Sequence, residues 1–134
     1  MSRSPKETEE VGMKLARELP KGSVLILEGE MGSGKTVFVR GVVSGMGGDP
    51  SEVVSPTYLG AIPYETPLGC VLHADLYRRQ GFPEEKVKWL EAFLEEEPTL
   101  LVVEWGKAPP FPCWEVHFTD KGGMERGIKI IRHE

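Results

Sequence analysis

One eight-residue segment has the residue types and spacing of a phosphate-binding loop. Residues 29 to 36 read GEMGSGKT, which matches the pattern G-x-x-x-x-G-K-[ST]. Its glycines let successive backbone amides turn toward phosphate oxygens without a Cβ clash. We expect Lys35 to reach the β and γ phosphates of ATP and the hydroxyl of Thr36 to bind Mg²⁺. The residues expected to line the triphosphate are Met31, Gly32, Ser33, Gly34, Lys35 and Thr36.

Two carboxylates are candidates to complete this P-loop site. Glu104 ends the apolar run Leu100 to Val103, so it should emerge at the carboxyl edge of a sheet and bind Mg²⁺ or its water shell. The alternative is a helix cap or a surface charge. Asp75 follows the run Cys70 to His73 and would orient the attacking water or support the metal from the outer shell, unless it only caps a turn. The sequence does not decide whether Glu104 or Asp75 positions the attacking water.

Other polar residues flank this edge. Ser55 and Thr57 lie between the P-loop helix and the next strand, where nucleotide-sensing switch loops are commonly found. His73 is interpreted as a strand-end residue held by hydrogen bonds rather than as a catalyst. Trp105 either packs on the nucleotide side of the sheet or fills the core.

The elements that position these residues follow from local patterns. Ser4, Pro5 and Glu7 form a helix start, and the helix should run to about Leu19. The continuous apolar run Val24 to Leu27 is typical of a central strand covered on both faces. A second helix follows from Lys35 to about Ser44.

The remaining pattern alternates strands and helices. Pro63 would put its strand at an edge of the sheet, because proline donates no ladder hydrogen bond. The other expected elements are a hairpin of residues 61–64 and 70–73, a helix over 83–96, a strand over 100–104 and a closing hairpin of 114–118 and 127–131. The order predicts an α/β fold: a single P-loop NTPase-like domain over residues 1–134, with a mixed, partly antiparallel central sheet flanked by helices.

Composition limits the classes of function. A chain of 134 residues favours one domain, and no apolar run approaches the ~20 residues of a membrane span. The polar N-terminus lacks the apolar stretch of a secretory signal, so we expect a cytoplasmic protein with Cys70 and Cys113 reduced. A net charge of −5 argues against a broad nucleic-acid surface, although a local patch at Arg78 and Arg79 stays open.

Four blocks taken together resemble one family, TsaE, formerly YjeE. The blocks are the P-loop continuing to Gly41, Ser55-Pro56-Thr57-Tyr58, His73-Ala74-Asp75-Leu76-Tyr77-Arg78, and Val103-Glu104-Trp105. The resemblance implies a protein that hydrolyses ATP slowly and supports TsaD and TsaB homologues in the threonylcarbamoyladenosine modification of tRNA, without being the transferase. Direct contact with tRNA and the oligomeric state stay open.

The resemblance also assigns roles by position. It implies that Thr36 and Glu104 are the Mg²⁺ ligands and that Asp75 activates water. Ser55 with Thr57 would form the switch-like loop. Two further residues, Thr8 in the opening helix and Arg126 in the final hairpin, would flank the base and the ribose.

Two other functions compete with this interpretation. A small-molecule kinase uses the same lysine and Mg²⁺ chemistry, but it needs an acceptor pocket and usually an arginine-bearing lid. A nucleotide-gated binding module would use ATP to order the segment from Ser55 to Tyr58 for a partner, without required turnover.

Overall fold

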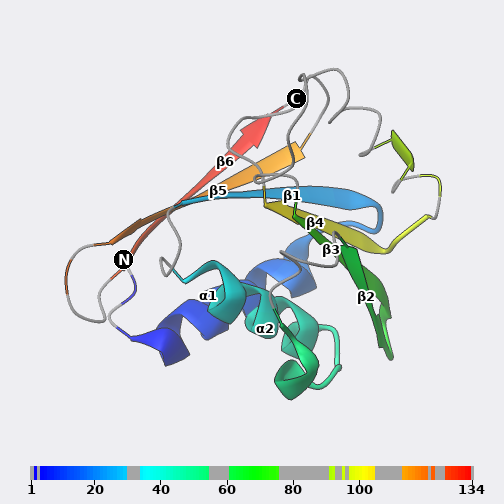
Figure 1. The fold of residues 1–134 in the computed structure, drawn as a ribbon, viewed down its shortest axis with the longest axis horizontal. Coiled ribbons are helices and arrows are strands. Elements are labelled where there is room, and N and C mark those ends of the chain that lie inside the picture. Colours follow the sequence, from blue (N-terminus) through cyan, green and yellow to red (C-terminus); the bar gives the residue numbers. More distant parts are fainter. Residues whose placement is uncertain are drawn as a thin grey trace.

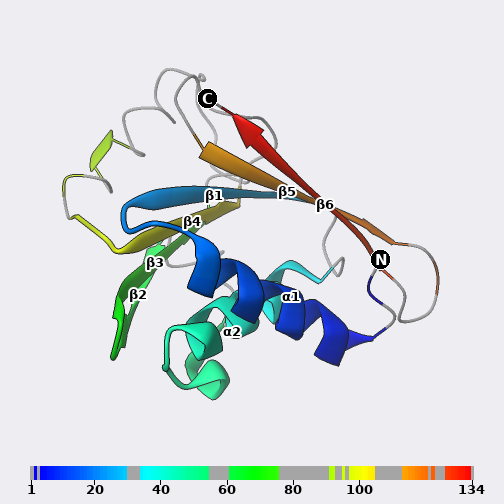
Figure 2. The ribbon, with the colours of Figure 1, turned by 180° about the vertical axis from the view of Figure 1, so that it is seen from behind.

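The structure is a computed structural model. It describes residues 2, 4–29, 34–54, 61–75, 91, 92, 95, 97–104, 113–120, 122 and 126–133. The elements are α1 (Pro5–Glu18), β1 (Ser23–Glu28), α2 (Lys35–Gly45), the 3-10 helix η1 (Pro50–Glu52), β2 (Ala61–Thr66), β3 (Gly69–Asp75), β4 (Leu100–Glu104), β5 (Cys113–Asp120) and β6 (Arg126–His133). Figure 1 shows α1 and α2 packed side by side against one face of a twisted sheet, and Figure 2 shows the same layers from behind.

The six strands form one mixed sheet in the order β2-β3-β4-β1-β5-β6. The four inner strands are parallel, and β2 and β6 pair antiparallel at the two edges. This confirms the predicted mixed sheet, and Pro63 lies on the edge strand β2 as predicted. The carboxyl ends of β1, β3 and β4 meet at one edge of the sheet, where Glu104 is the register partner of both Leu27 and Asp75.

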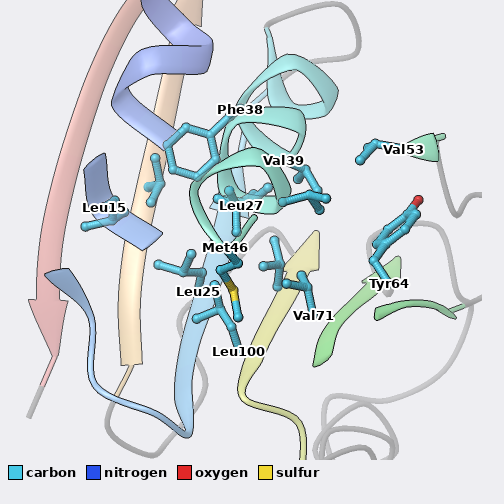
Figure 3. Packing of buried hydrophobic residues seen from close by; sticks show 14 of the residues in the cluster. Leu15, Leu25, Leu27, Phe38, Val39, Met46, Val53, Tyr64, Val71 and Leu100 are labelled. Atoms are coloured by element: carbon cyan, nitrogen blue, oxygen red, sulfur yellow. The ribbon is translucent and has the colours of Figure 1, made fainter. Parts of the chain in front are cut away.

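Both faces of the central strands are buried. Leu25 and Leu27 face a cluster that includes residues of α1 and α2 (Figure 3). In this cluster the rings of Phe38 and Phe118 meet edge to face, with centroids 5.4 Å apart. Val24 and Ile26 point to the opposite face, into a second cluster. This two-sided burial explains why β1 is a continuous apolar run rather than an alternating one.

The first helix begins as the sequence predicts. The Ser4 hydroxyl accepts a hydrogen bond from the Glu7 amide at 3.2 Å, and Pro5 opens the first turn. Leu15 is buried, whereas Lys14 and Arg17 are exposed. In the part of the chain described, no helix has both the length and the apolar character of a membrane span.

Glycines allow α1 and α2 to approach closely. A Cβ added at Gly41 would overlap the carbonyl oxygen of Glu9 and lie 2.8 Å from its carbonyl carbon. At Gly45 the added atom would lie 2.6 Å from the carbonyl oxygen of Met13, and at Gly12 it would overlap a carbonyl oxygen of α2. Because these neighbours are backbone atoms, the two helices can be this close only where side chains are absent.

Part of the predicted pattern lies outside the described residues. Of the helix expected over residues 83–96, only Glu91, Ala92 and Glu95 are described, and all three are helical. Trp105 and most of the turn between β5 and β6 also lie outside.

Candidate functional site

The start of α2 has the backbone features of an anion site. Gly34 is the N-cap residue of this helix, with φ +106° in the left-handed region that favours glycine, and no side chain of the described residues caps the first turn. The amides of a first helical turn have no partner within the helix, and the helix dipole adds positive potential there. Lys35 and Thr36 belong to this turn, so the N-terminus of α2 has the chemistry of an anion site.

A buried carboxylate faces this helix start. Glu104 ends β4 and is only 7 % exposed. Its Oε1 lies 3.7 Å from Nζ of Lys35, and its Oε2 lies 3.6 Å from Nε2 of His73. The structure therefore brings together the P-loop lysine and the predicted metal ligand. The burial of Glu104 argues against the alternative of a surface charge.

The electrostatic surroundings keep Glu104 ionised. Burial by itself would raise the pKa of this carboxyl, but the nearby imidazole of His73, joined by the ammonium of Lys35, outweighs burial and lowers the pKa below its usual value of 4.5. Near neutral pH the site therefore presents a negative charge beside a lysine. A divalent cation can replace the ammonium as the partner of such a carboxylate.

His73 lies deeper than the sequence indicates. Its side chain is fully buried, and neither ring nitrogen has a hydrogen-bond partner among the described residues. Its ring centroid lies 6.5 Å from that of Tyr64. Within the described part of the chain no hydrogen bond holds His73, so the interpretation of this residue as hydrogen-bonded in place is wrong. The polar neighbour of its Nε2 is instead the carboxylate of Glu104.

The backbone of Asp75 is adjacent to this site. Asp75 ends β3, and in the parallel pairing of β3 with β4 its register partner is Glu104. The two candidate carboxylate residues therefore end neighbouring strands at the same edge. The Asp75 side chain lies outside the description, so the division of roles between the two residues stays a prediction.

Thr8 lies near the start of α1 and is buried. Its hydroxyl oxygen is 2.7 Å from that of Ser2, which donates to the carbonyl oxygen of Ser4 at 2.8 Å. Since the Ser2 proton is used there, the Thr8 hydroxyl donates to Ser2. Both views place the N-terminal end of the chain beside the ends of β5 and β6 that the connecting turn joins, where Arg126 begins β6 (Figures 1 and 2).

Several predicted site residues cannot be placed. Of Arg126 only the backbone is described. The residues that lie wholly outside the described part are Met31, Gly32, Ser33, Ser55 and Thr57.

Two contacts near the site escaped the sequence analysis. His117 lies between two carboxylates, with Nδ1 3.2 Å from Oε2 of Glu28 and Nε2 3.2 Å from Oε2 of Glu115. This cluster ties β5 to the end of β1, directly before the P-loop. The hydroxyl of Tyr64 accepts from the Val54 amide at 3.0 Å and donates to the Val54 carbonyl at 3.3 Å. The spacing Glu115-x-His117 on one strand could have indicated the contact between these two side chains. No local pattern indicated the hydrogen bonds between Tyr64 and Val54.

Comparison with known proteins identifies the family. Residues 2–128 match the family described as "Threonylcarbamoyl adenosine biosynthesis protein TsaE". The chain belongs to the TsaE family. This confirms the resemblance drawn from the four sequence blocks and places the protein among those of tRNA threonylcarbamoyladenosine biosynthesis.

Individual TsaE proteins agree with this assignment. The chain is 36% identical over 134 residues to TsaE of Aquifex aeolicus, covering 94% of this chain and 92% of that one. It is 39% identical over 106 residues to TsaE of Synechocystis, covering 77% of this chain and 66% of the relative. Among solved structures, Bacillus subtilis YdiB matches with a TM-score of 0.69 and 25% identity, over 95% of this chain and 79% of that chain. The predicted α/β fold is confirmed by this match.

Proposed function

We propose that this TsaE protein binds ATP with Mg²⁺ at the P-loop, hydrolyses it slowly, and supports TsaD and TsaB homologues during threonylcarbamoyladenosine modification of tRNA in the cytoplasm. One observation carries the nucleotide part of the proposal: Nζ of Lys35 lies 3.7 Å from the buried carboxylate of Glu104. A P-loop site needs these two groups side by side, the cation for phosphate and the carboxylate for metal. The pathway part rests on family membership.

The residues at the start of α2 and at the end of β4 have the chemistry to bind ATP with Mg²⁺. The first turn of α2, which no described side chain caps, and the ammonium of Lys35 suit phosphate oxygens. The Thr36 hydroxyl with the ionised Glu104 suits the all-oxygen coordination that Mg²⁺ prefers. When bound, Mg²⁺ would neutralise charge on the phosphates. Lys35 would then turn from Glu104 toward the phosphates, and Glu104 would hold the cation.

The other predicted residues complete the proposed mechanism. Asp75, at the strand end next to Glu104, would position the attacking water. Thr8 and Arg126 would flank the base and ribose at the edge where the start of the chain meets the β5–β6 hairpin. Ser55 and Thr57 would respond to the nucleotide and change the surface that partners contact.

Hydrolysis measurements test this proposal. The rate of ATP hydrolysis would be measured with Mg²⁺, for the protein alone and with the TsaD–TsaB pair. We expect strong stimulation by the pair and its loss in Lys35→Ala, with Lys14→Ala as the matched control because Lys14 is exposed on α1. Unchanged stimulation in Lys35→Ala would refute the site.

Two outcomes would favour the competing functions. If ADP forms together with a phosphorylated metabolite, the protein is a small-molecule kinase. If Asp75→Ala keeps ATP binding and still supports the partners, nucleotide-gated binding without turnover is sufficient. Loss of partner support in Asp75→Ala with intact ATP binding would show that hydrolysis is required.

A further inference from the structure

The carboxylate of Glu104 contacts two different groups through its two oxygens. Oε1 faces Lys35 at 3.7 Å, and Oε2 faces His73 at 3.6 Å. Lys35 carries its ammonium on a flexible four-carbon stem at the start of α2. His73 stands on the inner strand β3, and its side chain is completely buried. The two partners of Glu104 therefore differ in side-chain type, a long flexible amine and a ring on a buried strand.

The buried imidazole has no other described partner. Both ring nitrogens of His73 lack a hydrogen bond within the described part of the chain. An unmade hydrogen bond at a buried polar group costs about 1–3 kcal/mol, so such a group calls for a functional account. Its Nε2 already points to Glu104, and shortening the 3.6 Å separation to the usual ~2.9 Å would complete a hydrogen bond. Hydrogen bonds of this kind are often long without ligand and tighten in the complex.

A second side chain, Tyr64, lies near the His73 ring. Tyr64 lies against His73 at 6.5 Å between ring centroids, and its hydroxyl is bonded to both backbone polar groups of Val54. Figure 3 shows Tyr64 on the same side of the cluster as Val53. The fully buried imidazole thus has Tyr64 as a ring neighbour and Glu104 near its Nε2.

We propose that His73 is a positioning residue for Glu104: its Nε2–H holds Oε2 while Oε1 remains free to bind the Mg²⁺ that accompanies the nucleotide. The proposal rests on the function proposed above, because it takes Glu104 as a metal ligand and Lys35 as a phosphate ligand. Once Lys35 has left for the phosphates, His73 is the described neighbour that still holds the carboxylate. Partners that orient a ligating carboxylate are typically worth about 10–100-fold in metal affinity.

Metal affinity, measured apart from turnover, tests the role. Mn²⁺ would replace Mg²⁺, and its dissociation constant would be measured by electron paramagnetic resonance with a non-hydrolysable ATP analogue bound. We expect His73→Leu to weaken Mn²⁺ binding at least about tenfold. Affinity for the nucleotide without metal should stay within about twofold, since that affinity depends on the P-loop amides and Lys35.

Two polar variants separate positioning from simple packing. His73→Gln carries an amide N–H near the place of Nε2, whereas the shorter His73→Asn reaches only the place of Nδ1. We expect Gln to restore most of the Mn²⁺ affinity and Asn to restore little. This pair keeps the proposal testable even where His73→Leu does not fold, and equal affinities in the two variants would overturn it.

The variant Glu104→Gln separates the positioning role of His73 from the metal-binding role of Glu104. If Glu104→Gln weakens Mn²⁺ binding but His73→Leu does not, the positioning role is wrong and the metal role of Glu104 stands. If Glu104→Gln has no effect, the proposed metal site itself is wrong. In the double variant, His73→Leu should add no further loss to Glu104→Gln, because the two residues act through one contact.

Discussion

Replacing Gly41 by alanine should destabilise the protein, although alanine is the better helix former. The added methyl would overlap the carbonyl oxygen of Glu9 and lie 2.8 Å from the carbonyl carbon. Carbon atoms prefer a separation of about 3.5–4.0 Å, so α1 has to move outward by roughly 1 Å. The atoms in the way are backbone, and no flexible side chain can yield instead.

The expected size follows from two opposing terms. Overpacking an interior costs about 1–3 kcal/mol, and the rigid neighbour at Gly41 argues for the upper end. Alanine regains about 1 kcal/mol of helix propensity over glycine. We therefore expect a net loss of about 2 kcal/mol in the free energy of unfolding, or about 6–10 °C in Tm for a chain of this size.

Urea unfolding followed by far-ultraviolet circular dichroism would measure this loss. Ser44→Ala is the matched control on the same helix, because it adds no atoms and should leave stability unchanged or slightly higher. Gly45→Ala, whose added Cβ would lie 2.6 Å from the Met13 carbonyl oxygen, should also destabilise the protein. The argument is refuted if Gly41→Ala is as stable as the parent protein or more stable, since the methyl would then have found room.

Three further predictions concern single side chains. Tyr64→Phe removes both hydrogen bonds to Val54 and should cost about 1–2 kcal/mol in thermal melts, and a loss below about 0.5 kcal/mol would contradict the contact. Because the folded-state pKa of Glu104 is lowered, its ionisation contributes stability above about pH 4.5 that is lost as the pH falls through the lowered folded value. The stability difference between the parent and Glu104→Gln, measured by urea unfolding from about pH 6 to 3, should therefore shift against the parent on acidification, and a constant difference would contradict the shift. Burial, helped by the charge of Glu115, raises the pKa of the Cys113 thiol to about 11, so peptide mapping should find Cys113 unmodified by N-ethylmaleimide at about pH 7.5 in the native protein and modified in urea.

Local patterns were enough to predict the helices α1 and α2 and the six strands. The apolar runs at residues 24–27 and 100–103 could be buried only by covering both faces, and β1 and β4 are the two innermost strands. Pro63 predicted an edge strand for a reason that no tertiary contact can override, the missing amide proton. The cap at Ser4 likewise needs only residues within one turn.

The arrangement of the site depends on pairings that the sequence does not display. Glu104 and Asp75 were each predicted at a strand end, but their adjacency follows from β3 lying beside β4 in one particular register. The same register brings His73 within reach of Glu104, and no local pattern indicates that a histidine will be buried without a hydrogen bond. The cluster of His117 with Glu28 depends in turn on the pairing of β1 with β5, two strands from opposite ends of the chain.

That last pairing has a consequence for synthesis on the ribosome. The strand that leads into the P-loop is made early, at residues 23–28, but its neighbours are residues 100–104 and 113–120. At about 5–20 residues per second, translation leaves β1 without its β5 neighbour for about 4–17 s. During that interval an apolar strand is exposed to chaperones and to other nascent chains. A translational pause shortly before residue 113 would prolong this exposure.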